Sequence, residues 1–135
     1  NTEKTGPAFR ASMLIDAGKL DEAIALYRTC DQGKEIDNVL CREGLGIALE
    51  TKASMEKDTA ARQKLLEESL EAFLRMQPAE DGARRAYALY HQGRLQLLLG
   101  KRAEAKALLE KVKAMTPPKE LADLIERRLS AIGVI

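Results

Sequence analysis

A short motif occurs twice in this chain and constrains its fold more than any other feature. Residues 18–23 read GKLDEA and residues 100–105 read GKRAEA, so that Gly, Lys, Glu and Ala recur at the same places. Each copy lies between two stretches whose apolar residues recur at spacings of three and four, as in amphipathic helices. Repetition of this kind predicts stacked helical hairpins, because one hairpin is too small to bury its own apolar face.

The composition is that of an ordinary globular chain. Of the 135 residues, 45% are hydrophobic, and the 22 basic and 21 acidic residues are interspersed. No basic block could neutralise a row of phosphates, so nucleic acid is not an expected partner. The longest apolar run, residues 95–99, is too short to span a bilayer, and we expect no direct membrane insertion by this fragment. The chain begins at Asn1 rather than Met, which suggests that a signal or anchor segment has been removed.

Apolar spacing predicts about seven helices and no strands. We expect residues 1–6 to be disordered or a linker, and residues 7–135 to form a single all-α domain. Pro7 suits a first helical turn, and Gly18 and Gly100 suit helix ends. The expected hairpins cover about residues 7–31, 37–77 and 81–115, and a capping helix covers about residues 118–132.

The same spacing predicts which side chains point inward. In the second helix these are Leu20, Ala23, Ile24, Tyr27 and Cys30, and in the third they are Leu40, Gly44, Ile47 and Ala48. In the later helices they are Leu66, Leu70, Phe73, Leu89, Tyr90, Gly93, Leu97, Ala105, Leu109, Val112, Leu121, Leu124, Ile125, Leu129 and Ile132. The charged residues of the last helix should face solvent, as in a terminal cap: Glu120, Asp123, Glu126, Arg127 and Arg128.

The hairpins resemble tetratricopeptide repeats, in which a small residue lies where two helices cross and a Gly lies near the turn. The first hairpin offers Ala11, Gly18, Ala23, Tyr27 and Cys30, and the third offers Gly93, Gly100, Ala105, Leu109, Val112 and Pro117. The middle hairpin offers Gly44, Leu66, Leu70, Phe73 and Pro78. The resemblance implies a right-handed α-solenoid of three irregular repeats plus a C-terminal capping helix.

The repeats depart from the standard length. Ala23 and Ala105 lie 82 residues apart, whereas two 34-residue repeats would separate them by about 68 residues. The excess falls between Gly44 and Leu66 and between Pro78 and Gly93. We therefore expect the middle hairpin and the helix after it to be longer than standard, and the stack to curve irregularly.

The resemblance also implies a concave face formed by the first helix of each hairpin. Its predicted groove residues are Phe9, Ser12, Asn38, Arg42, Leu45, Tyr87, Tyr90, His91 and Arg94, with Cys41 beside them. Tyr and Arg are residue types that carry much of the binding energy at interfaces. The alternative for Tyr87 and Tyr90 is that they pack inside an elongated hairpin.

We find no pattern that predicts chemistry, and we expect no enzyme, no cofactor and no metal site. His91 is the single histidine, and no nucleophile or orienting acid accompanies it at a recognisable spacing. Cys30 and Cys41 lack the spacing and the nearby His of a zinc site. We expect them to be buried free thiols, since Cys packs as a small hydrophobe; pairing is the alternative in an oxidising compartment.

Two functions follow from this interpretation. The first is a non-enzymatic interaction module or scaffold that holds a peptide or a partner subunit on the concave face, with Arg42, Tyr87, His91 and Arg94 exposed there. The second is a homo-oligomerising structural subunit, in which Leu129, Ile132, Val134 and Ile135 bury against a second copy. The resemblance suggests a bacterial envelope protein whose anchor is removed, and a cytoplasmic protein is the alternative.

Overall fold

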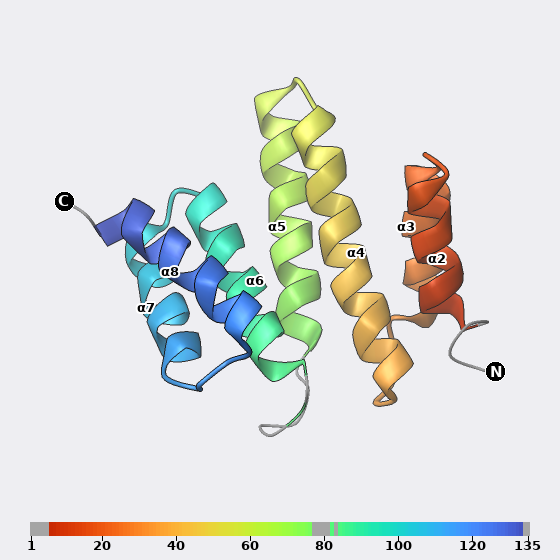
Figure 1. Ribbon diagram of the computed structural model, residues 1–135. Coiled ribbons are helices and arrows are strands. Elements are labelled where there is room, and N and C mark those ends of the chain that lie inside the picture. Colours follow the sequence, from red (N-terminus) through yellow and green to blue (C-terminus); the bar gives the residue numbers. More distant parts are fainter. Residues whose placement is uncertain (1–5, 77–81, 83, 134–135) are drawn as a thin grey trace. The chain divides into compact units, whose positions relative to one another are not determined.

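The computed structural model describes residues 6–76, 82 and 84–133, and this part of the chain contains seven α-helices and no strand (Figure 1). The all-α prediction with seven helices is confirmed. The helices are α2 (Pro7–Asp16), α3 (Leu20–Cys30), α4 (Ile36–Met55), α5 (Thr59–Met76), α6 (Arg85–Leu98), α7 (Arg102–Lys113) and α8 (Lys119–Gly133). Of the expected boundary residues, Pro78 and Asp81 lie outside the described residues, as does most of the predicted linker 1–6.

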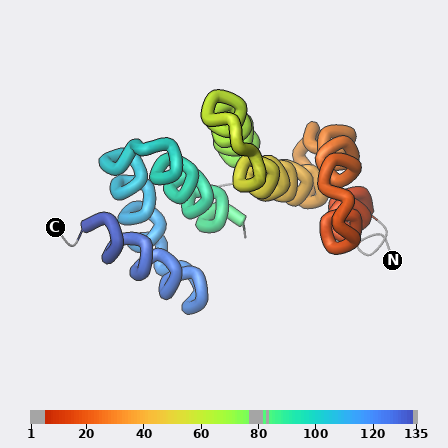
Figure 2. The backbone as a smooth tube through the Cα atoms, turned by 90° about the horizontal axis from the view of Figure 1, so that it is seen from above, coloured from red at the N-terminus to blue at the C-terminus, as the bar shows by residue number. Residues whose placement is uncertain are grey.

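The chain divides into two compact units. Unit 1 covers residues 1–77 and contains α2 to α5, and unit 2 covers residues 78–135 and contains α6 to α8. In unit 1, α3 packs against α2 and α4, α4 packs against α2 and α5, and consecutive helices run side by side (Figures 1 and 2). The organisation of residues 7–135 as a single domain stays a prediction.

The repeated motif forms the same helix end in both units. Gly18 and Gly100 have φ angles of +77° and +82°, which glycine adopts without a steric penalty. The amide of Gly18 donates to the carbonyl of Ile15 and that of Lys19 to Leu14; Gly100 and Lys101 donate in the same way to Leu97 and Gln96. These paired bonds satisfy the last carbonyls of α2 and α6, and the chain then enters the next helix.

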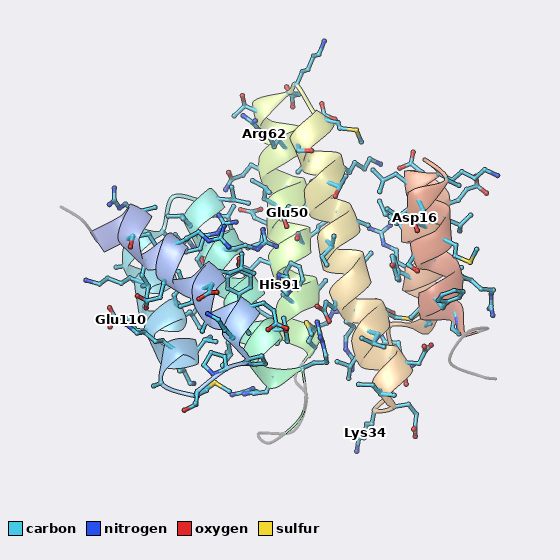
Figure 3. The ribbon with its side chains drawn as sticks, viewed as in Figure 1. Asp16, Lys34, Glu50, Arg62, His91 and Glu110 are labelled. Carbon is cyan, nitrogen blue, oxygen red and sulfur yellow. A yellow bond between two sulfur atoms is a disulfide. The ribbon has the colours of Figure 1, made fainter. Side chains whose placement is uncertain are left out.

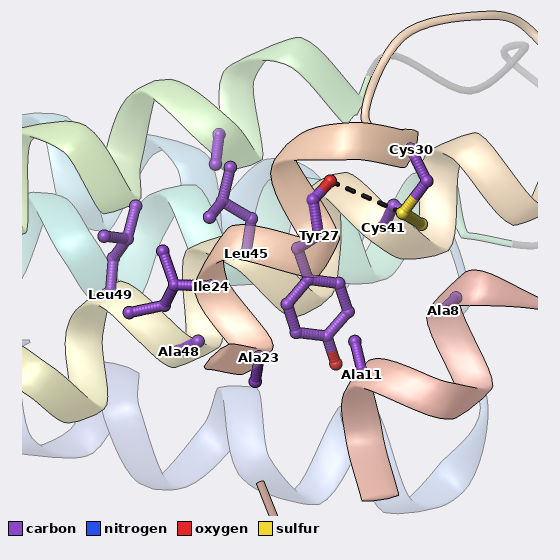
Figure 4. Close-up of a cluster of buried hydrophobic side chains, with 11 residues drawn as sticks. Ala8, Ala11, Ala23, Ile24, Tyr27, Cys30, Cys41, Leu45, Ala48 and Leu49 are labelled. Carbon is purple, nitrogen blue, oxygen red and sulfur yellow. Dashed lines mark hydrogen bonds between the residues drawn. A yellow bond between two sulfur atoms is a disulfide. The ribbon is translucent and has the colours of Figure 1, made fainter. Parts of the chain in front are cut away.

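The core of unit 1 lies between α2, α3 and α4. Ala23, Ile24, Tyr27 and Cys30 are buried as predicted, and the Tyr27 ring points toward Ala11 (Figure 4). The other buried members of this cluster are Ala8, Cys41, Leu45, Ala48, Leu49 and Ala72. The small residues on α2 and α3 let these two helices approach each other closely.

Two glycines on α4 admit rings from opposite neighbours. A Cβ atom at Gly44 would collide with the Tyr27 ring of α3, and one at Gly46 would lie 2.6 Å from Cζ of Phe73 on α5. The Ser69 hydroxyl donates a 2.6 Å hydrogen bond to the Gly46 carbonyl. Gly46 and Ser69 are therefore the small residues at the crossing of α4 with α5.

The predicted inward face of α4 is wrong at two positions. Leu40 and Ile47 are 38% and 43% exposed, whereas Val39, Leu45 and Leu49 are buried. The prediction placed Gly44 at the crossing with the second helix of its hairpin, where the structure has Gly46. Ala48 is buried as predicted, and Gly44 packs against the Tyr27 ring of α3 rather than against α5.

Unit 2 packs α7 against both α6 and α8. Its core contains Leu89, Tyr90, Ala105, Leu109, Val112, Leu121, Ile125 and Ile132. The position of a Cβ atom at Gly93 lies 3.0 Å from Leu109, so Gly93 is at the crossing of α6 with α7, as predicted. Helix α8 buries its apolar face within the unit and exposes Glu120, Asp123, Glu126 and Arg127, with Arg128 half-buried.

Candidate functional site

The three predicted groove residues on α4 lie in different surroundings. Arg42 and Leu45 are 8% and 3% exposed, and Asn38 is half-buried. The expected exposure of Arg42 is therefore wrong, because its guanidinium is bonded to the connection between α3 and α4. Leu45 instead lies at the floor of a hollow of about 510 Å³ between α3, α4 and α5, whose rim carries charges of both signs.

Arg42 holds the connection between α3 and α4. Its two terminal nitrogens donate to the carbonyl oxygens of Asp31 at 2.7 Å and of Gly33 at 3.0 Å. The buried Asp31 carboxylate forms an ion pair with the guanidinium of Arg75 on α5, at 2.9 Å. Burial lowers the pKa of the Arg42 guanidinium, and the neighbouring Arg75 acts in the same direction while Asp31 opposes it. Arg42 is thus a buried structural charge.

Asn38 braces the same connection. Its side-chain amide donates to the Cys30 carbonyl at 2.9 Å, and its oxygen accepts from the amide of Glu35 at 3.1 Å. The second bond is half of a capping box. In the other half, the Glu35 side chain accepts a hydrogen bond from the backbone N–H of Asn38. Figure 3 shows Lys34 extending outward from this connection.

The two cysteines form a disulfide, so the expectation of free thiols is wrong. The bond joins Cys30, the last residue of α3, to Cys41 in the second turn of α4, and the Cα atoms lie 5.9 Å apart (Figure 4). Cys30 and Cys41 are buried, as predicted. Thiol burial was predicted on packing alone, and packing does not distinguish a pair of thiols from a disulfide.

The predicted residues on α2 lie at its surface. Phe9 is 42% exposed, and the half-buried Ser12 donates its hydroxyl to the Phe9 carbonyl at 2.7 Å. Met13, four residues after Phe9 and on the same side of the helix, is also exposed. This outer side of α2 is opposite Ala11, which packs into the core of unit 1.

The predicted residues on α6 lie close together. Tyr90 is buried in the core of unit 2, which is the alternative that the sequence left open for it. The half-buried Tyr87 lies under the guanidinium of Arg84, 4.0 Å from the ring centre. Arg94 lies 3.1 Å from Nδ1 of His91 and 5.9 Å from the Tyr90 ring centre. Tyr87, His91 and Arg94 are half-buried rather than fully exposed as expected. The part of their surface that reaches solvent is both aromatic and basic.

An exposed apolar surface of α4, the longest helix of unit 1, was missed by the sequence analysis. Ile36, Leu40 and Ile47 are 60%, 38% and 43% exposed and lie on one side of α4. We call these three residues the α4 stripe. Spacings of four and seven place them on one helical face. Leu40 and Ile47 were assigned to the core, and Ile36 was placed just before the helix, which was expected to begin near residue 37.

Within residues 6–76, 82 and 84–133, no three His, Cys, Asp or Glu residues gather as a metal site would require. No helix of that same part of the chain is long and apolar enough to cross a membrane. Comparisons with protein-family models, curated proteins and solved structures found no match. The contacts and exposure of the chain itself are therefore the basis for inferring its function.

Proposed function

We propose that this chain is a non-enzymatic interaction module that binds an amphipathic helix of a partner protein on the α4 stripe. The observation that carries the proposal is the exposure of Ile36, Leu40 and Ile47 on one side of α4, a helix that also packs against α2, α3 and α5. A helix that is apolar on its outer face as well as its inner faces has a surface to cover.

The shape of the stripe favours a helical partner. Ile36 to Ile47 spans about 16 Å along the axis, or about three turns. Helices pack by fitting ridges of side chains spaced three and four apart into matching grooves. A partner helix with apolar side chains at that spacing would cover Ile36 and Leu40. It would reach Ile47 past Glu43, which is 7% exposed, and Gly44, against which the Tyr27 ring packs.

We also propose a specific architecture, an α-solenoid like that of tetratricopeptide repeats. Its hairpins would be α2–α3, α4–α5 and α6–α7, and α8 would be the cap. Three facts support it. Each of these helix pairs packs together, and within unit 1 the first helix α2 also contacts the next first helix, α4. The first and third hairpins end their first helix with the same glycine turn. Small residues lie at the crossings, with Gly46 and Ser69 in the middle hairpin and Gly93 and Ala105 in the third.

Self-assembly through the last helix has less support. Ile132 is 7% exposed and belongs to the core of unit 2, and Leu129 packs against that core. Val134 and Ile135 lie outside the described residues. Since α8 uses its apolar face within its own unit, a second copy would find little apolar surface on it.

The proposal is tested by photo-cross-linking in extracts of the source cell. A benzophenone amino acid is placed at Ile47, and at the exposed Glu71 of α5 as the control position. We expect a discrete cross-linked protein from position 47 and none of the same mass from position 71, with the cross-linked site in a helix of that protein. Cross-links only between copies of the chain would replace the proposal with self-assembly, and equal products from both positions would reject it.

A further inference from the structure

The disulfide closes the connection between α3 and α4 in unit 1. It joins the end of α3 to the second turn of α4 and encloses residues 31–40. Cys30 is 7% exposed and Cys41 is fully buried. The Cys30 sulfur lies 3.4 Å from the Tyr27 carbonyl oxygen, and the Cys41 sulfur lies 3.9 Å from the Asp37 carboxylate. Protein atoms therefore surround both sulfurs.

The enclosed segment supplies partners to buried polar groups. The carbonyls of Asp31 and Gly33 accept from Arg42, and the Asp31 carboxylate is paired with Arg75. If the Arg42 guanidinium lost these acceptors, the folded state would be destabilised, because a buried charge without hydrogen-bond partners has lost its hydration and gained nothing in return. The cross-link holds the segment in the conformation that these charges need.

Burial also controls how the bond can be broken. Reduction requires a thiolate to approach a disulfide sulfur in line with the bond, and access is one of the terms that set the rate. The surrounding backbone blocks that approach, and the Asp37 carboxylate repels an incoming anion. Reduction must therefore wait for unit 1 to open, which a folded core permits only rarely.

We propose that the Cys30–Cys41 disulfide is a permanent cross-link, formed while unit 1 folds in an oxidising compartment and inaccessible to thiol reagents once folding is complete. Such compartments are the extracellular space, the endoplasmic reticulum lumen and the bacterial periplasm. The bond forms by exchange with a disulfide-bearing oxidant. The oxidant's own sulfur–sulfur bond breaks, and its two sulfurs leave as thiols with the two electrons and two protons given up by the cysteines.

The accessibility claim is tested by reducing the full chain with dithiothreitol in native buffer and in concentrated urea. Samples are quenched by alkylation and weighed by mass spectrometry, with oxidised glutathione in the same solution as an exposed disulfide. We expect reduction in native buffer to be at least about a hundredfold slower than in urea, while glutathione is reduced at similar rates in both. Equal rates for the protein disulfide in both solutions, with the helical circular dichroism signal intact in native buffer, would show an accessible switch and overturn the proposal.

The dependence of folding on the bond is tested without relying on a mutant that folds. The oxidised chain and the same chain reduced and alkylated in urea are compared after removal of denaturant. Closing a loop of this size changes the unfolding equilibrium constant about a hundredfold. We expect the reduced chain to be destabilised by that factor or more, with hydrogen exchange faster in α3 and α4. A reduced chain with an unchanged urea midpoint and unchanged exchange would contradict the proposal.

Discussion

The hydroxyl of Ser69 on α5 donates a 2.6 Å hydrogen bond to the backbone carbonyl of Gly46 on α4. Ser69 is fully buried, and one turn further along α5 the ring of Phe73 covers the space that a side chain at Gly46 would need. This contact fixes the rotation of α4 about its axis. The contact of Gly44 with the Tyr27 ring of α3 restrains the same rotation from the other side.

Replacing Gly46 with Ala should destabilise unit 1. The new methyl group would lie 2.6 to 2.8 Å from ring carbons of the fully buried Phe73. We expect a loss of about 2 kcal/mol in the free energy of unfolding, since overpacking outweighs the better helix propensity of Ala. Urea unfolding followed by circular dichroism measures it. Gly133→Ala is the matched control, because a Cβ atom there meets nothing within 4 Å, and a similar loss in both variants would contradict this packing.

The repeated glycine turns predict a matched pair of effects. Gly18 and Gly100 have positive φ angles, and each has open space around the position of a Cβ atom. Substitution by Ala should therefore cost backbone strain alone, about 1 kcal/mol at each position. Similar losses from Gly18→Ala and Gly100→Ala in urea unfolding would support the equivalence of the two turns. An effect at one position only would show that the repeated motif is coincidental.

The helices were predictable, as were the buried faces of most of them, but the rotation of α4 was not. Helix bounds follow from apolar spacing and from local signals such as Pro7 and Gly18, which act within a few residues. Gly44 and Gly46 lie two residues apart, and each accommodates a ring, so which of them meets α5 depends on Phe73 in another helix. The inward face of α4 was therefore misassigned at Leu40 and Ile47.

The disulfide was missed for a related reason. Nothing in the spacing of Cys30 and Cys41 distinguishes it from that of two separate buried thiols. Their meeting depends on how α3 and α4 are placed, which Tyr27 and Gly44 help to determine through tertiary contact.

Arg42→Ala should destabilise the chain, which a groove residue would not do. The change removes two hydrogen bonds and leaves the carbonyls of Asp31 and Gly33 without their donor. We expect a loss of about 3 kcal/mol, measured as the shift of the urea midpoint. The exposed Arg62 of α5 is the control, and Arg62→Ala should change stability by less than about 0.5 kcal/mol. Equal stability of the two variants would place Arg42 outside the buried network.

Stability should fall at high pH because of Tyr27. Burial, and secondarily the charges of Asp16 and Glu43, raise the pKa of its phenol above the ordinary value of 10.0. The unfolded chain then loses its phenol proton at a lower pH than the folded chain, so this contribution to stability is present below pH 10 and declines as the pH rises beyond it. Thermal unfolding of the wild type and of Tyr27→Phe between neutral pH and the alkaline range measures the difference. The variant should lose less stability, and parallel curves would contradict the prediction.

The most direct test of the interaction proposal is the affinity of the cross-linked partner helix for the double variant Leu40→Gln/Ile47→Gln. Leu74→Gln on α5 is the matched control, because Leu74 is a similarly exposed apolar residue, at 40% exposure. We predict binding at least about tenfold weaker for the double variant and unchanged for the control, with both chains fully folded by circular dichroism. Unchanged affinity of the double variant would show that the partner does not bind on the α4 stripe.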